Sequence, residues 1–424
     1  MNVSFRLGSS SEKLELSKDI FPFFDNAFLP ERAFIPIGYK DEDEPSLLVS
    51  NASRVQEGEL IGRGKASSPF SLIHASIPGK VQGIREFEIM PGKILNTLDI
   101  FLDGSFDILG KAKKEYDWES DDVHTILNKI ENAGIADTAG RIVRPLSTYL
   151  KKAIHKNITE ISTTLFDFYP SQFLDVFLGK EHIKKVIEGA RILSHVLNDV
   201  AIKIFHNIKD KRLLARYKEE VASICGNLQC HFQKIKNVYP VHLQLHPSTF
   251  FVDASTACYV YEAVVNNIPL TSIYVSLQGE LLAKPKIFRV KIGTPIVNLI
   301  RECGSLKATP NGAIINGITS GYAIKDLNIP ITREMKSVHV VGKKCLHLAE
   351  EMDCIGCARC FNVCPCDIDP IAVVRAIKRG AITEEVSSSI KRCSGCACCS
   401  IVCPARNKLA RMITSYKDQF YNED

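Results

Sequence analysis

Ten of the 15 cysteines in this 424-residue chain lie between residues 354 and 403, where eight of them form two runs of identical spacing. The first run is Cys354-x2-Cys357-x2-Cys360-x3-Cys364-Pro365, and the second is Cys393-x2-Cys396-x2-Cys399-x3-Cys403-Pro404. One [4Fe-4S] cube needs four thiolates, and spacers of two residues let three of them converge from one tight loop. The spacing therefore predicts two [4Fe-4S] clusters.

The fourth cysteine of each run stands beyond the loop, and in chains with two such runs it ligates the cluster held by the other run. We therefore expect the first cluster on Cys354, Cys357, Cys360 and Cys403. We expect the second cluster on Cys393, Cys396, Cys399 and Cys364. The proline after each fourth cysteine blocks regular backbone pairing at that point.

Other uses of clustered cysteines fit this spacing less well. A structural zinc site takes two Cys-x2-Cys pairs, whereas each run here has three closely spaced cysteines and then Cys-Pro. A disulfide framework is typical of short secreted domains, not of a long chain with its cysteines at one end. Cys398 is an alternative to Cys399 as a ligand, but the Cys-x2-Cys register favours Cys399. Cys366 is most simply a small buried apolar side chain.

The other cysteines and one histidine pair give weaker signals. We interpret the five dispersed cysteines as small buried hydrophobic residues: Cys225, Cys230, Cys258, Cys303 and Cys345. His242 and His246 have the i, i+4 spacing of a helical metal pair, but the sequence between them alternates as a strand does. On a strand the two imidazoles would not converge on a metal ion, and no third ligand lies nearby.

Length and composition limit the class of protein. A chain of 424 residues is too long for one hydrophobic core, so we expect three or four domains. The net charge of +5 is too small and too scattered to indicate nucleic-acid binding. No stretch approaches the ~18 apolar residues of a membrane span, and the first residues lack the apolar core of a signal peptide. We expect a cytosolic protein without a transmembrane helix, which only partner subunits would hold at a membrane.

Residues 1–110 are predicted to form a β domain with an N-terminal extension. Glycine and proline break residues 30–104 into short β segments. Segments 55–62 and 74–81 resemble the two halves of a lipoyl-like barrel-sandwich domain. No Met-Lys or Asp-Lys pair stands between them to carry lipoate or biotin, so we expect an architectural module.

Residues 111–284 are predicted to form an α/β domain. Residues 121–132 have apolar side chains on one helical face and end before Gly134, and residues 181–197 form a longer amphipathic pattern. Strand-like runs at 200–205 and 272–277 alternate with the helical ones, which favours a largely parallel sheet.

The last two parts complete a multidomain fold of the α/β plus β class. Residues 285–340 return to short strands and turns around a predicted helix at 296–303, and they resemble a small β-grasp domain of the SLBB type. Residues 341–424 contain both cysteine runs and are predicted to form a helical, ferredoxin-like domain with two clusters.

In this order the four parts resemble the C subunit of the Rnf electron-transport complex, an ion-pumping membrane oxidoreductase. The resemblance covers most of the chain. It rests on the two cysteine runs and on segments 55–62, 74–81, 253–270, 290–296 and 316–332. It implies a Rossmann-like, flavin-type α/β domain similar to the flavoprotein subunit of respiratory complex I. It also implies a peripheral position on the cytoplasmic side of the inner membrane, beside membrane subunits of the complex.

Two loops depart from the family pattern. The family's FMN and NADH loop resembles Gly-x-Gly-Gly-Ala-Gly-Phe-Pro, whereas residues 134–145 keep Gly134 and Gly140 and add Asp137. Side chains there obstruct the close backbone approach that phosphate binding needs, and a carboxylate adds repulsion. A second family loop, Tyr-Pro-x-Gly-Gly-Glu, is Tyr-Pro-Val-His-Leu-Gln at 239–244. We therefore expect the flavin-domain fold without a working FMN and NADH site.

Together these features predict an electron-transfer subunit, the possible NADH or ferredoxin oxidoreductase component of a translocating complex. No catalytic triad, Walker loop or carboxylate pair stands out, so no catalytic residue is predicted. Electrons would arrive from a donor such as soluble ferredoxin or flavodoxin. Basic residues flank the second run and either dock that donor, tune a potential or form an ordinary solvated face: Lys391, Arg392, Lys408 and Arg411. The alternatives are an NADH-oxidising FMN subunit of the same complex and a non-pumping, ferredoxin-like adaptor.

Overall fold

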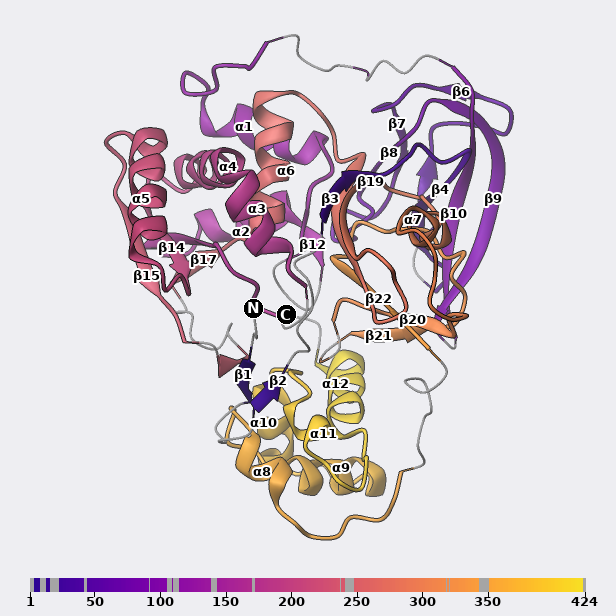
Figure 1. The fold of residues 1–424 in the computed structure, drawn as a ribbon, viewed down its shortest axis with the longest axis vertical. Coiled ribbons are helices and arrows are strands. Elements are labelled where there is room, and N and C mark those ends of the chain that lie inside the picture. The colour runs from indigo at the N-terminus through magenta and orange to yellow at the C-terminus, as the bar shows by residue number, and fades with distance from the viewer. Residues whose placement is uncertain are drawn as a thin grey trace.

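The computed structural model describes residues 4–7, 13–15, 23–41, 44–90, 92–104, 109, 114–138, 143–169, 172–236, 238–240, 248–317, 319, 321–342 and 351–421. Within these residues the chain forms a mixed α/β structure with several sheets. Figure 1 shows an α/β lobe and a β-rich lobe side by side, with a helical lobe below them.

Seven strands between residues 32 and 102 form the β-rich lobe. They are β4 (Arg32–Tyr39), β5 (Ser46–Leu47), β6 (Arg54–Val55), β7 (Leu60–Arg63), β8 (Leu72–His74), β9 (Gly79–Met90) and β10 (Lys93–Leu102). One antiparallel sheet has the order β4-β10-β9-β6, and the other has the order β5-β7-β8. Ile35 and Ile100 of the first sheet and Ile61 and Ile73 of the second are fully buried in one core. Apolar side chains of both sheets therefore contribute to the same core.

A parallel sheet with helices packed on it forms the α/β lobe. Its strands are β13 (Glu160–Thr164), β14 (Ala201–His206), β15 (Cys230–Lys234) and β17 (Thr249–Phe251), in the order β15-β14-β13-β17. The helices are α1 (Val123–Asn132), α2 (Leu146–Ile154), α3 (Leu174–Glu181), α4 (Ile183–Val196), α5 (Lys211–Cys225) and α6 (Ala254–Val265). A short antiparallel pair, β11 (Ala136–Asp137) and β12 (Arg144–Pro145), precedes α2.

Local sequence explains where these helices begin and how closely they pack. Helix α1 begins after Asp122, whose carboxylate accepts a hydrogen bond from the Thr125 N–H at 2.8 Å. The amphipathic helix predicted at 181–197 is α4, and His182, at φ −131°, separates it from α3. Gly189 lets α4 approach α6, since a Cβ at this position would stand 1.9 Å from the Ala257 carbonyl oxygen.

A six-stranded mixed sheet lies between these two lobes. Its strands are β3 (Phe23–Asn26), β18 (Ser272–Gln278), β19 (Lys286–Lys291), β20 (Gly312–Ile315), β21 (Tyr322–Ile324) and β22 (Ser337–Val341), and α7 (Ile296–Glu302) follows β19. Their order is β21-β20-β22-β18-β19-β3. The prediction that 272–277 continues the parallel sheet is wrong, because β18 pairs antiparallel with β19 and parallel with β22. All but one of its residues are buried, so no alternating pattern indicates which sheet it joins.

The helical lobe contains α8 (Arg359–Val363), α9 (Pro370–Arg379), α10 (Glu384–Arg392), α11 (Cys398–Ile401) and α12 (Leu409–Phe420). Helix α8 packs against α11, and α9 packs against α12. Asp369 caps the start of α9, and Gly380 ends it in the left-handed conformation at φ 66°. A small sheet of β1 (Ser4–Leu7), β2 (Lys13–Glu15) and β16 (Val238–Tyr239) lies beside this lobe in Figure 1.

Two buried cations from the segment between β21 and β22 join the upper lobes. Arg333 donates from Nη1 to the carbonyl oxygens of Pro69 at 2.7 Å and of Gly134 at 3.2 Å. Lys336 forms an ion pair with Asp253 at the start of α6. The segment thus fixes the β-rich lobe, the turn after α1 and the six-stranded sheet to one another. No helix in the described ranges has both the length and the apolar character to cross a membrane.

Candidate iron–sulfur site

The two cysteine runs fold into the same backbone shape. Cys354 and Cys393 begin the runs, 39 positions apart, and backbone positions of positive φ recur at that interval. These positions are Gly356 (71°) and Gly395 (69°), Ala358 (55°) and Ala397 (61°), and Asp367 (49°) and Arg406 (58°). Left-handed conformations are costly for residues other than glycine. Their recurrence in both halves indicates that each loop is bent in the same way to bring its three cysteines round one point.

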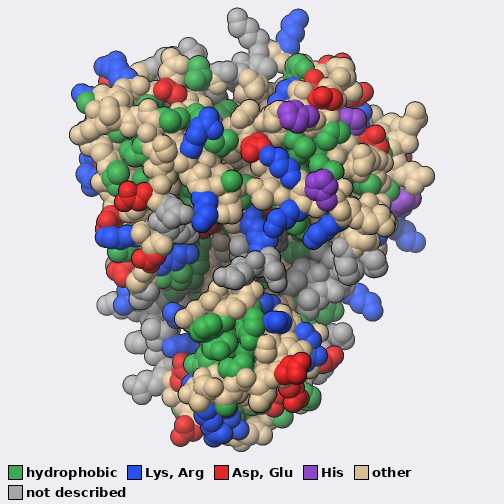
Figure 2. Space-filling view, turned by 180° about the vertical axis from the view of Figure 1, so that it is seen from behind, with side chains coloured by type: hydrophobic (Ala, Val, Ile, Leu, Met, Phe, Trp, Pro, Cys, Tyr) green, Lys and Arg blue, Asp and Glu red, His purple; other side chains and the backbone are tan. Residues whose placement is uncertain are grey.

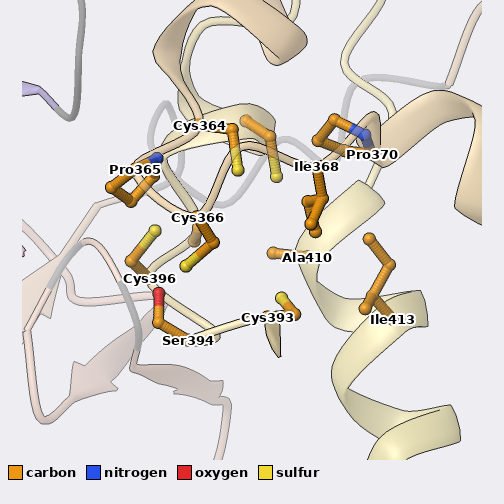
Figure 3. Close-up of a pocket in the computed structure, with 12 residues that line it drawn as sticks. Cys364, Pro365, Cys366, Ile368, Pro370, Cys393, Ser394, Cys396, Ala410 and Ile413 are labelled. Atoms are coloured by element: carbon orange, nitrogen blue, oxygen red, sulfur yellow. The ribbon is translucent and has the colours of Figure 1, made fainter. Parts of the chain in front are cut away.

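Cysteines from both runs surround one hollow between the repeats. Cys393, Cys396 and Cys399 line it together with Cys364 of the first run, which is the set predicted for the second cluster. The hollow is open to solvent, and its space together with the solvent at its mouth is about 320 Å³. Ala410 and Ile413 of α12 close one side, and Figure 3 shows the sulfur atoms of Cys364, Cys393 and Cys396 facing the same space.

Backbone N–H groups are directed at these sulfur atoms. The N–H of Ile368 donates to Cys364, that of Gly395 to Cys393, and that of Cys398 to Cys396. Such donors stabilise negative charge on sulfur. A hydrogen bond from the Cys398 thiol lowers the pKa of Cys396 to about 7, whereas burial raises the pKa of Cys399 to about 12. The donors and the four thiols are the groups that an iron–sulfur cluster requires, so the residues present fit such a group.

Lys417 supplies a positive charge beside the same hollow. From α12 its Nζ donates to the carbonyl oxygens of Lys391 at 2.6 Å and Cys393 at 2.9 Å. Sequence reasoning missed this residue, because a lysine on a terminal amphipathic helix has no spacing that links it to the cysteines.

The two unassigned cysteines of this lobe differ in position. Cys366 lines the hollow, is half-buried, and has its pKa lowered to about 6 by a hydrogen bond from the Cys364 thiol. The prediction that Cys366 is only a small buried apolar side chain is therefore wrong. Cys398 is fully buried, and its Sγ lies 3.9 Å from the carbonyl oxygen of Tyr239. Cys399, and not Cys398, lines the hollow, as the register favours.

The start of the first run meets the end of the second. Asn407 donates from Nδ2 to the Met352 carbonyl oxygen at 3.0 Å and to Cys403 Sγ at 3.9 Å. The Met352 N–H donates to the Ala405 carbonyl oxygen at 2.9 Å. Because Met352 and Ala405 each lie two residues from a cysteine, these bonds bring Cys403 to the loop that begins at Cys354.

The two loops differ in exposure. Cys357 of the first loop is exposed, whereas the equivalent Cys396 is only 9% exposed. Met352, Ile355 and Phe361 near Cys357 are 54%, 70% and 52% exposed. Figure 2 shows hydrophobic side chains gathered on one face of the helical lobe.

The second loop lies against β16 of the small three-stranded sheet instead. Tyr239 of β16 lies in the same apolar core as Cys398 and Cys399. The first set of cysteines is thus nearer to solvent, and the second set is nearer to the rest of the chain.

Basic residues flank this lobe on its surface. Lys408 forms an ion pair with Glu351 at 3.3 Å, and Lys391 Nζ lies 5.1 Å from the ring centre of Tyr421. Arg392 and Arg411 are exposed. Some residues of the sequence predictions lie outside the described residues: Gly140, residues 241–244 of the second family loop with His242, His246 and Cys345. Across the described ranges, no three or more His, Cys, Asp or Glu side chains gather closely enough to hold a single metal ion.

A buried group of carboxylates occupies the carboxyl edge of the parallel sheet, where α/β folds bind ligands. Asp167 follows β13 and Asp253 follows the neighbouring β17. Asp175 of α3 and Lys336 lie beside them, and all four side chains are buried. Thr138, in the stretch compared with the FMN loop, donates its hydroxyl to Asp253 at 3.0 Å.

Charges within this group are set by burial and by one lysine. Burial raises the pKa of Asp175 well above its ordinary value and the pKa of Asp167 to about 6. Burial opposes ionisation of Asp253 as well, but the charge of Lys336 and its hydrogen bond hold the Asp253 pKa below its ordinary value. A phosphate group needs N–H donors and cations. Three carboxylates around one lysine, Lys336, which already pairs with Asp253, do not fit the phosphate of FMN.

No family model matches the chain. The chain is 25% identical over 389 residues to the C subunit of the proton-translocating ferredoxin:NAD(+) oxidoreductase complex of Clostridium ljungdahlii, and the match spans 87% of this chain and 83% of the relative. It is 23% identical over 374 residues to the C subunit of the Na(+)-translocating ferredoxin:NAD(+) oxidoreductase complex of Acetobacterium woodii, 82% of each chain. This chain is homologous to the C subunits of ion-translocating oxidoreductase complexes.

Other C subunits of such complexes are longer. The C subunit of the ion-translocating oxidoreductase complex of Yersinia enterocolitica is 24% identical over 370 residues, which are 81% of this chain and 51% of that protein. The chain therefore spans about half the length of this relative. Among solved structures, a chain of an NAD+-reducing [NiFe]-hydrogenase in the air-oxidized state has a TM-score of 0.49 and 14% identity, covering 70% of this chain and 62% of that one. The family resemblance predicted from the ordered segments is confirmed by these C-subunit relatives.

Proposed function

We propose that this chain is the iron–sulfur electron-transfer subunit of an Rnf-like, ion-translocating oxidoreductase complex, with two [4Fe-4S] clusters and no working FMN and NADH site. The observation that carries the proposal is the convergence of Cys364, Cys393, Cys396 and Cys399 on one hollow. The names of the C-subunit relatives support the assignment to such a complex. When bound, each cluster would supply one-electron uptake and release.

The protein's own contribution is to hold sulfur, to place donors and to exclude water. Cys354, Cys357, Cys360 and Cys403 would hold the first cluster, supported by the bonds of Asn407. The second set would be held in a more buried place, with backbone N–H groups and Lys417 directed toward it. Donors and burial of this kind set the potential of a cluster. The exposed loop at Cys357 is the side at which we place the redox partner.

The arrangement of the lobes supports a domain composition of four parts. The two facing antiparallel sheets suit a barrel-sandwich domain within 1–110, and the parallel sheet suits a flavin-type α/β domain within 111–284. The short strands around α7 suit an SLBB-like β-grasp domain at 285–340. The repeated helical unit suits a two-cluster, ferredoxin-like domain at 341–424. Strand β18, within the second of these ranges, pairs with strands of the third.

The cellular position that we propose for the protein is based on its C-subunit relatives. We place it peripherally on the cytoplasmic side of the inner membrane, bound to the membrane subunits of the complex, with a soluble ferredoxin or flavodoxin as donor. Co-purification from membranes tests this part. Recovery of the chain with integral membrane subunits is the expected result, and recovery as a free soluble protein would favour the ferredoxin-like adaptor.

Flavin loading tests the second part of the proposal. Anaerobic protein that contains its clusters would be incubated with excess FMN, desalted and assayed for flavin, and its visible absorption would then be followed during an NADH titration. We expect flavin far below one per chain and no bleaching of the clusters by NADH, while dithionite bleaches them. Stoichiometric flavin with bleaching by NADH would instead establish an NADH-oxidising subunit, as the ferredoxin:NAD(+) oxidoreductase names of the relatives suggest.

A further inference from the structure

Two cysteines far from the helical lobe meet across a tight turn. Cys225 is the last residue of α5, and Cys230 is the first residue of β15. The Leu228 N–H donates to the Cys225 carbonyl oxygen at 3.0 Å, and Gly226 takes a positive φ of 57° with open space where a Cβ would stand. This turn places the two thiols in hydrogen-bonding contact.

The two thiols have different surroundings. Cys225 is 3% exposed, whereas Cys230 is only half-buried, so its interpretation as a buried hydrophobic residue is wrong. Cys230 opens the edge strand of the parallel sheet, where only one side is paired. The hydrogen bond from the Cys225 thiol lowers the pKa of Cys230 and raises that of Cys225, and the nearby charge of Arg191 acts to lower both. Cys230 is therefore the more accessible and more readily ionised sulfur.

We propose that Cys225 and Cys230 form a reversible disulfide by exchange with a low-molecular-weight disulfide, as a redox site separate from the iron–sulfur clusters. The Cys230 thiolate attacks one sulfur of the small disulfide, which forms a mixed disulfide and releases one small thiolate. The Cys225 thiol then loses its proton to solvent, and its sulfur attacks Cys230 Sγ. The bond between Cys230 and the small molecule breaks, and a second small thiol leaves. Two protein thiols are oxidised, and one small disulfide is reduced to two thiols.

The rest of the chain shows why this pair differs from its other dispersed cysteines. Cys258 and Cys303 are 0% and 1% exposed. Burial raises the pKa of both thiols, that of Cys303 to about 12. Neither has the access or the ionisation that thiol–disulfide exchange needs. Only the turn after α5, among these four cysteines, combines a reachable thiol with a second thiol in contact. A bridge there would join the end of α5 to the start of the edge strand β15.

Oxidised glutathione is the probe that tests the proposal. The full chain, with its clusters, would be incubated anaerobically with oxidised glutathione, quenched in acid, alkylated and digested for mass spectrometry. We expect a peptide pair linked through Cys225 and Cys230 that dithiothreitol separates, while Cys258 and Cys303 stay fully alkylated. Alkylation of Cys230 in the untreated protein should be at least about tenfold faster than alkylation of Cys303.

Single substitutions assign the two roles. Cys225→Ser should leave a glutathione adduct on Cys230 that does not resolve, and Cys230→Ser should remove both the adduct and the linked pair. Cys303→Ser, the matched control, should leave the linked pair at the wild-type level. Cluster absorption would be recorded on the same samples. Unchanged absorption shows that the clusters are intact, so that thiols released from the clusters do not account for the result. Complete alkylation of both cysteines after treatment would overturn the proposal, and so would a persistent glutathione adduct on wild-type Cys230.

Discussion

Replacing Lys336 by methionine removes a cation from among three buried carboxylates. Lys336 pairs with Asp253, and the exposed fractions of the two side chains are 10% and 2%. The Thr138 hydroxyl and the Thr256 N–H continue to donate to Asp253 at 3.0 Å and 2.7 Å, but the ion-pair partner is gone. Asp175 lies close enough to Asp253 for the two charges to oppose each other. The variant therefore leaves a buried charge with hydrogen bonds and no counter-charge.

The size of the effect follows from this burial. Removing one partner of a buried ion pair costs about 3–5 kcal/mol, because the remaining charge stays desolvated. With about 2–4 °C per kcal/mol for a unit of 150–250 residues, the melting temperature of Lys336→Met should fall by about 6–20 °C. The loss should shrink as the pH is lowered, because Asp253 then takes up a proton and no longer needs a counter-charge.

A double-mutant cycle supplies the assay. Melting would be followed by circular dichroism for Lys336→Met, Asp253→Asn and the double variant. Asp253→Asn should cost less than Lys336→Met because Asp175 can ionise beside the lysine, and the double variant should recover much of the loss. Lys151→Met is the control, since Lys151 and Glu131 are about half exposed and such a pair contributes about 0–1 kcal/mol. The reasoning is refuted if the free energy of unfolding of Lys336→Met lies within about 1 kcal/mol of the wild-type value. It is also refuted if the double variant is no more stable than Lys336→Met.

Four further substitutions test other parts of the structure. Cys396→Ser should remove the second cluster and about half of the iron, whereas Cys398→Ser should keep the iron; equal losses in an iron assay would contradict the ligand set. Gly189→Ala should lower the free energy of unfolding by about 1–3 kcal/mol through overpacking of α4 on α6, and an unchanged melting curve would count against that packing. Burial raises the pKa of Asp175, so at this carboxyl the folded chain binds more protons than the unfolded chain above about pH 4, and its contribution to stability falls as pH rises. Asp175→Asn should weaken this dependence of stability on pH. Melting temperatures measured at several pH values between about 5 and 8 test this, and a slope equal to that of the wild type would contradict the prediction.

Local signals allowed several elements to be predicted from sequence. The periodicity at 121–132 and the stop before Gly134 predicted α1, which spans Val123–Asn132. The helix expected at 296–303 is α7, Ile296–Glu302. The mixed α/β class was also predicted correctly. In each case the determining interactions lie within a few residues of the element itself, so the sequence contains them.

Long-range interactions explain what could not be predicted. The pairing of β18 with β22 depends on segments some 60 residues apart, and a strand buried on both faces gives no sign of its partner. The place of Cys366 in the hollow depends on how two repeats pack, and spacing alone does not describe packing. The ion pair of Asp253 with Lys336 joins two sheets, and neither residue stands out in its local sequence.

Quantification of iron and acid-labile sulfide in anaerobically purified protein tests the central claim most directly. The proposal predicts about eight iron atoms and about eight sulfides per chain, with the brown colour of [4Fe-4S] clusters and bleaching by dithionite. Colourless protein that contains zinc and little iron would contradict it.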